Sequence, residues 1–109
     1  MPAGFWIETN WGESFDEVTE KEITLILQNI FKNKKSDAAF WIGDNEGLHV
    51  LEIHNDFNLY YTYGENMDKR LTAAADGIVQ CSYIVNMFIS ENFLLFRNRF
   101  GKDCLKFLP

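Results

Sequence analysis

The sequence has few of the residues that stabilise small proteins through disulfides or bound metal ions. It has two cysteines, Cys81 and Cys104, and neither lies in a CxxC pair or in the spacing of metal ligands. We therefore expect both to be reduced and to pack as small apolar residues. No apolar run is long enough to span a bilayer, and no basic segment followed by an apolar one marks a signal peptide. These absences predict a cytoplasmic protein without disulfides or membrane contact.

Catalytic motifs are also missing. The sequence has no GxSxG or HExxH motif, no phosphate-binding loop with its lysine, and no glycine pattern of dinucleotide-binding proteins. Asp44, Glu46 and Asp56 lack the spacing of a calcium loop. We therefore expect no catalytic residue, no metal site, no cofactor and no small-molecule substrate, so the protein is not predicted to be an enzyme.

The two histidines are not expected to act together. His49 and His54 are five residues apart on one predicted strand, so their side chains point to opposite faces. We interpret His49 as a structural histidine and His54 as solvent-exposed. The enzymatic alternative requires a deep apolar pocket on which His49, Glu52 or Cys81 converge.

Basic residues are absent from the middle of the chain. The whole sequence has 10 Lys and Arg against 16 Asp and Glu, a net charge of −6. This balance argues against direct nucleic-acid binding, because nucleic acids attract basic surfaces. Between Ser36 and Asp68 there is no basic residue. The acidic residues of this segment form either an ordinary solvated surface or a surface that meets a basic partner.

Apolar residues are plentiful by contrast. Hydrophobic residues make up 47% of the 109 residues and aromatic residues 16%, which is enough for one compact core. We therefore predict a single α+β domain over residues 1–109. Its expected architecture is an antiparallel β-sheet of about five to six strands, with an N-terminal amphipathic helix packed on one face and a short C-terminal helix.

A capping box marks the start of the first predicted helix. The Thr19 hydroxyl can accept a hydrogen bond from the Glu22 amide, while the Glu22 carboxylate can reach back to the Thr19 amide. A strand over Ala3–Thr9 precedes this box. The sequence therefore predicts a helix from Glu20 to Lys32. The apolar residues that follow the box form one helical stripe: Ile23, Ile26, Leu27, Ile30 and Phe31.

The segment Ala38–Tyr63 contains three predicted antiparallel strands separated by two turns. A four-residue loop over Asp44 to Gly47 joins the first two strands. The length of the second turn, within Asn55 to Asn58, decides which side chains share a face, because a slip of one residue inverts them all. The first loop pairs Phe40 with Leu51, Trp41 with Val50, and Ile42 with His49.

We prefer a three-residue second loop, because it separates the meander into an apolar face and a mixed face. The apolar face packs against the helix and consists of Phe40, Ile42, Leu51, Ile53, Leu59 and Tyr61. The mixed face shows Trp41, Val50, Glu52, Tyr60 and Thr62.

The C-terminal third is predicted to contain two strands, a helix and a final strand, in that order. Leu71–Ala75 is a short strand, and the strict alternation of apolar residues over Gly77–Ile89 predicts a long one. Ser90 offers a cap for a short helix over Glu91–Phe100, against a rival strand interpretation. Cys104–Leu108 is the final predicted strand.

The mixed face and the turns beside it are the predicted partner-binding surface. Aromatic side chains supply contact area at interfaces, and carboxylates steer an oppositely charged partner. The predicted binding residues are Trp41, Asp44, Glu46, Glu52, Asp56, Tyr60, Glu65 and Asp68.

The order of the predicted elements resembles that of immunity proteins from bacterial polymorphic-toxin systems, including contact-dependent growth inhibition. An opening strand (FWIET) precedes an amphipathic helix (EITLILQNIF), followed by two strands around an acidic turn (AAFWIGDNEGLHVLEI). An aromatic third strand (NLYYTYGEN) and a C-terminal helix and strand (FLLFRNRFGKDCLKFL) complete the pattern over nearly the whole chain. The departure lies at the end, where the family pattern has a longer and cleaner final helix.

The resemblance implies a stoichiometric inhibitor that forms a heterodimer with the C-terminal domain of a cognate toxin. Many such toxins are nucleases with basic sites, which an acidic partner reaches quickly through electrostatic steering. The acidic residues of the predicted surface would form salt bridges, with Trp41 and Tyr60 as anchors. The alternative is a small adaptor module, or a homodimer built by sheet extension, without a toxin partner.

Overall fold

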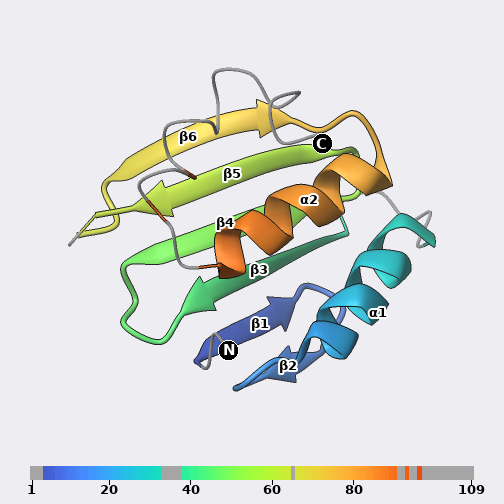
Figure 1. Ribbon diagram of the computed structural model, residues 1–109, viewed down its shortest axis with the longest axis horizontal. Helices are drawn as coiled ribbons and strands as arrows, with labels where there is room; N and C mark the ends of the chain where they lie inside the picture. The colour runs from blue at the N-terminus through green and yellow to red at the C-terminus, as the bar shows by residue number, and fades with distance from the viewer. Residues whose placement is uncertain (1–3, 33–37, 65, 91–92, 94–95, 97–109) are drawn as a thin grey trace.

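The computed structural model describes residues 4–32, 38–64, 66–90, 93 and 96 (Figure 1). These residues form an α+β fold in which six antiparallel strands make one sheet, in the spatial order β2-β1-β3-β4-β5-β6. Two helices lie on one side of the sheet (Figure 1). The elements are β1 (Phe5–Thr9), β2 (Ser14–Phe15), α1 (Glu20–Lys32), β3 (Ala39–Asp44), β4 (His49–His54), β5 (Asn58–Tyr63), β6 (Lys69–Ala74) and α2 (Ile78–Ile89).

Helix α1 begins at the predicted capping box. The Thr19 hydroxyl accepts from the Glu22 amide at 3.2 Å, and the Glu22 carboxylate accepts from the Thr19 amide at 2.9 Å. Two strands precede α1, so the chain opens with sheet and not with helix. The inward side of the helix packs on the sheet and consists of Ile23, Ile26, Leu27 and Ile30, all buried.

Helix α2 replaces the long strand predicted over Gly77–Ile89, so that prediction was wrong. The segment is apolar on almost every side, and its residues therefore satisfy the period of a strand as well as that of a helix. The buried apolar side chains repeat at helical spacing and belong to the core: Cys81, Ile84, Val85, Phe88 and Ile89.

The register between β3 and β4 differs from the prediction by two residues. Phe40 lies opposite Ile53 and Ile42 opposite Leu51. The reason lies in Asp44, whose carboxylate accepts hydrogen bonds from the amides of Leu48 and His49 at 3.0 and 2.9 Å. This contact keeps Asp44 in the strand and moves the turn one residue along the chain. Because a shift of two preserves the alternation, each side chain still lies on the predicted face.

The second turn has the preferred length. His54 and Asn58 flank a three-residue loop, and the pairing of Ile53 with Leu59 and Leu51 with Tyr61 follows from it. The last loop residue, Phe57, has a positive φ of 69° and stacks on Phe31 of α1, with ring centroids 4.7 Å apart. The predicted apolar face is confirmed, because all six of its side chains are fully buried: Phe40, Ile42, Leu51, Ile53, Leu59 and Tyr61.

The remaining predictions fall partly outside the described residues. Strand β6 runs from Lys69 to Ala74, close to the predicted Leu71–Ala75, and pairs with β5. Of the predicted helix over Glu91–Phe100 only Phe93 and Phe96 are described, and both pack on the core. The predicted strand Cys104–Leu108 lies outside the described residues, as do Cys104 and Glu65. Cys81 is buried, as predicted.

Candidate partner-binding face

The sheet has a core face, which packs against the helices, and an opposite side that we call the outer face. The alternation of residues along the strands places fourteen residues of β1 and β3 to β6 on the outer face. Within the part of the chain that the structure describes, no helix or strand lies over this face. The outer face consists of Trp6, Glu8, Ala39, Trp41, Gly43, Val50, Glu52, His54, Asn58, Tyr60, Thr62, Arg70, Thr72 and Ala74.

Three of the predicted binding residues lie side by side at the centre of the outer face. Trp41 pairs with Glu52 across β3 and β4, and Glu52 pairs with Tyr60 across β4 and β5. Glu8 of β1 lies on the other side of Trp41. Opposite residues of antiparallel strands have Cβ atoms about 5 Å apart, so these side chains form a continuous row across four strands.

Glu52 connects the side chains of this row. Its carboxylate accepts a hydrogen bond from the Trp41 indole at 2.9 Å and contacts the His54 ring nitrogen. The Arg70 guanidinium is 3.9 Å away and stacks on the Tyr60 ring, 4.5 Å from its centroid. The Glu52 side chain is only 20% exposed, whereas Arg70 is 53% exposed. These contacts hold the Trp41 and Tyr60 rings in a fixed arrangement, and a surface that is already fixed loses less entropy in an interface than a mobile one.

Trp6 supplies a second aromatic surface at one end of the outer face. Its ring lies against Gly43, so close that a Cβ atom at position 43 would be 2.4 Å from Cζ2 of Trp6. The indole nitrogen donates to the Asp44 carbonyl at 3.2 Å. Gly43 is therefore required here because its missing side chain makes room for the tryptophan.

The predicted acidic residues are divided between the two ends of the sheet. Asp44 is the last residue of β3, Glu46 lies in the β3–β4 turn, and Asp68 precedes β6 at the same end of the sheet. Asp56 lies in the β4–β5 turn at the opposite end. Glu46 and Asp68 are exposed, whereas Asp44 is half-buried and bonded to the turn amides. The acidic residues therefore frame the outer face and do not form one cluster.

Asp56 has a structural role in its turn. Its carboxylate accepts from the backbone amide of Asn58 at 3.0 Å and from the Asn58 side chain at 2.9 Å. The backbone hydrogen bond of Asn58 lowers the pKa of the Asp56 carboxyl below its ordinary value of 3.8, because it stabilises the ionised form. This turn fixes the loop length on which the two faces depend.

The predicted mixed face lacked four charged or aromatic residues of the outer face. Trp6 and Glu8 alternate in β1, but only the pairing of β1 with β3 shows that they join the face. Arg70 comes from β6 and brings a positive charge beside a segment that has none of its own. His54, predicted to be solvent-exposed, is 28% exposed and contacts Glu52. The charge pattern of the sequence does not show which side chains are neighbours in the sheet, because adjacent strands can be distant in sequence.

The residues of the enzymatic alternative do not converge. His49 bonds to the Tyr61 hydroxyl at 2.7 Å and stacks on Phe93, while Glu52 lies on the outer face and Cys81 in the core. His49 therefore has the structural contacts that were predicted for it. Among the described residues, no three His, Cys, Asp or Glu side chains are grouped to hold a metal ion.

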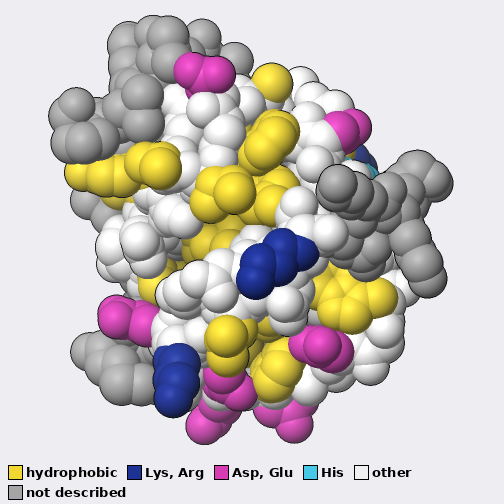
Figure 2. All heavy atoms as spheres, turned by 90° about the vertical axis from the view of Figure 1, so that its right-hand side faces the viewer, with side chains coloured by type: hydrophobic (Ala, Val, Ile, Leu, Met, Phe, Trp, Pro, Cys, Tyr) yellow, Lys and Arg dark blue, Asp and Glu magenta, His cyan; other side chains and the backbone are white. Residues whose placement is uncertain are grey.

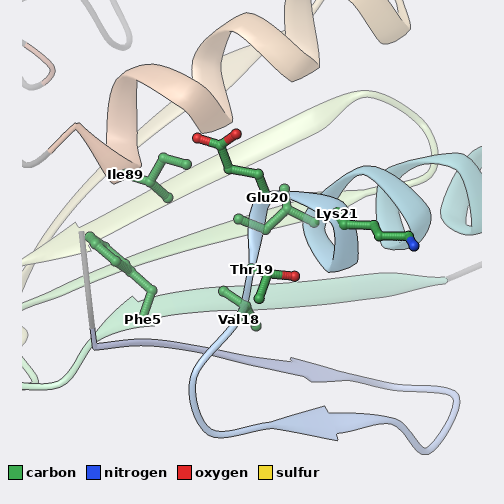
Figure 3. Close-up of a pocket in the computed structure, with 7 residues that line it drawn as sticks. Phe5, Val18, Thr19, Glu20, Lys21 and Ile89 are labelled. Carbon is green, nitrogen blue, oxygen red and sulfur yellow. The ribbon is translucent and has the colours of Figure 1, made fainter. Parts of the chain in front are cut away.

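A pocket of about 450 Å³ opens on the helical side of the molecule (Figure 3). It lies where α1 begins and α2 ends, and its walls are mainly apolar. Glu20 points toward the end of α2, whereas Lys21 points away from the pocket (Figure 3). The lining residues are Phe5, Val18, Thr19, Glu20, Lys21, Ile23 and Ile89.

Neither α1 nor α2, the two helices of the described chain, has the length and apolar character needed to cross a bilayer. No protein-family model, curated protein or solved structure matches this chain.

Proposed function

We propose that this protein is an immunity protein, which binds a cognate bacterial toxin domain in the cytoplasm and neutralises it by stoichiometric inhibition. The outer face is the binding surface in this proposal. The observation that carries it is the row of Trp41, Glu52 and Tyr60, which is held in a fixed arrangement on a sheet face that no helix or strand of the described residues covers. Preformed aromatic surfaces of this kind supply most of the affinity in protein interfaces.

The charge of the protein supports a basic partner, such as a toxin with nuclease activity. The net charge is −6, and Glu8, Glu46 and Asp68 are exposed on or beside the outer face. These groups would accelerate the encounter with a basic surface, whereas the central row would determine how slowly the complex dissociates. Raising the salt concentration should therefore slow association and change dissociation little.

The experiment expresses the domain encoded directly upstream of this protein in bacteria, alone and together with the protein. We expect the domain to inhibit growth when it is alone and a one-to-one complex to restore growth. Trp41→Ala and Tyr60→Ala should each weaken the complex by about tenfold or more, because both remove a central aromatic contact. Binding is measured by calorimetry with purified proteins.

Tyr83→Ala is the matched control. Tyr83 is 38% exposed on α2, on the opposite side of the sheet, so its removal should leave the affinity unchanged. The proposed surface is wrong if the folded Trp41→Ala and Tyr60→Ala variants protect and bind as well as the wild type. An upstream domain that is neither toxic nor bound would contradict the immunity function itself.

A further inference from the structure

Helix α2 has no charged residue in its 12 positions. Its inward side packs on the sheet, yet its outward side is also apolar: Val79 is 70% exposed, Ile78 48% and Tyr83 38%. Helix α1, which lies beside it, has the usual outward side with Lys21 and Lys32. A helix that is hydrophobic all round is normally buried on all sides. The outward side of α2 therefore has the composition of a contact surface.

Exposed apolar side chains are also visible over this part of the molecule. Figure 2 shows the side of the molecule where α1 ends and α2 begins, and several hydrophobic groups reach the surface there. Leu25 of α1 is 50% exposed and points away from the buried stripe of its helix. Leu25, Val79 and Tyr83 together give the helical layer an apolar outer surface that an isolated monomer leaves in water.

We propose that the outward side of α2 docks a second copy of this chain in a two-fold symmetric dimer. Two copies of charge −6 repel each other over most of their surfaces, and α2 presents a surface free of like charges. A basic partner would form no salt bridge with α2, because the helix has no carboxylate. The charge distribution therefore favours self-association here and association with a different protein on the outer face.

The polar groups on the outward side of α2 also suit a symmetric contact. In a two-fold interface the same patch meets itself, so its hydrogen-bonding groups must be able to pair with their own kind. The Tyr83 hydroxyl and the Asn86 amide each donate and accept, whereas a carboxylate or an ammonium does only one of these. The side chain of Asn86 is exposed beside Tyr83 on the helix.

Such a dimer would keep both outer faces free. The helical layers would meet in the middle, and the two sheets would lie outside with their outer faces pointing in opposite directions. One dimer could then bind two partner molecules. The contact is small, because a helix of 12 residues is only about 18 Å long. We therefore expect a dimer that dissociates on dilution.

Sedimentation analysis of the full chain, from micromolar to millimolar concentration, tests the proposal. The wild type should shift from the mass of one chain toward the mass of two as the concentration rises. Val79→Glu should remain at the mass of one chain or require at least about tenfold higher concentration, because the dimer would bury two like charges. Circular dichroism checks that the variant keeps its helices.

Thr72→Glu is the matched control, because it adds the same charge on the exposed outer face. It should dimerise like the wild type. If Val79→Glu does not fold, Val79→Ala decides, since it removes only apolar contact area and should weaken the dimer by a few-fold. The proposal is overturned if the wild type stays at the mass of one chain up to millimolar concentration. It is also overturned if Val79→Glu and Thr72→Glu weaken the dimer equally. Trp41→Ala should leave the dimer unchanged, so this proposal and the immunity function can fail separately.

Discussion

The two faces of the sheet are built from alternate residues of the same strands, yet they are organised by different forces. On the core face, Phe40, Leu51 and Tyr61 are fully buried, and their positions follow from the need to fill space under the helices. On the outer face, Trp41 and Glu52 are half-buried and are positioned by specific contacts with their neighbours. Phe40 and Trp41 are therefore neighbours in sequence whose positions are fixed differently, Phe40 by packing in the core and Trp41 by its hydrogen bond to Glu52.

The largest expected effect is a difference in stability between variants of Phe40 and variants of Trp41. Phe40→Ala removes a fully buried ring and should lower the free energy of unfolding by about 3–5 kcal/mol. Trp41→Phe keeps a ring on the outer face and loses the hydrogen bond to Glu52, which should cost only about 1 kcal/mol. Urea unfolding measures both values. Equal losses would mean that the outer face is packed as tightly as the core.

A smaller effect is expected at the glycine under Trp6. Gly43→Ala places a methyl group against the Trp6 ring and should cost about 1–3 kcal/mol, because the ring must move and lose its bond to Asp44. The double-mutant cycle with Trp6→Ala sharpens the result. In the Trp6→Ala background, Gly43→Ala should lower the free energy of unfolding much less, because the ring that it would displace is absent. Identical costs in both backgrounds would show that the glycine is required for another reason.

The smallest effect concerns Asp56, whose turn sets the relation between the two faces. Because folding lowers the pKa of this carboxyl, its contribution to stability is present above the unfolded value of 3.8 and is lost as the pH falls through the lower folded value. The free energy of unfolding of the wild type should therefore fall more steeply below about pH 4 than that of Asp56→Asn. Thermal melts at a series of acidic pH values measure the difference. Parallel pH profiles would contradict the role of the ionised carboxylate in the turn.

Much of the fold could be predicted because the local signals agree. The capping box and the stripe after it define α1, and the three-residue loop before Asn58 assigns every side chain of the meander to its face. Helix α2 could not be identified by periodicity, because an apolar segment with few polar residues fits both spacings. The register error came from the Asp44 side chain, whose bonds to Leu48 and His49 cannot be read from turn composition.

The candidate site could be predicted only where it is local in sequence. Trp41, Glu52 and Tyr60 lie in consecutive strands joined by short turns, so alternation alone brings them together. Trp6 and Arg70 come from strands whose neighbours depend on the whole topology. Only the three-dimensional structure shows that Trp6 lies against Gly43 and that Arg70 lies over the Tyr60 ring.

The strand order has a consequence for how the protein folds. Strands β3 to β6 are joined by short loops, so each pairing closes a small loop of chain and loses little entropy. The pairing of β1 with β3 must enclose β2 and α1, and the Trp6–Asp44 hydrogen bond spans 38 residues. The meander is thus expected to form early, with β1 docking late. In the native state the same strand should open first, so amide hydrogens of β1 should exchange faster than those of β4.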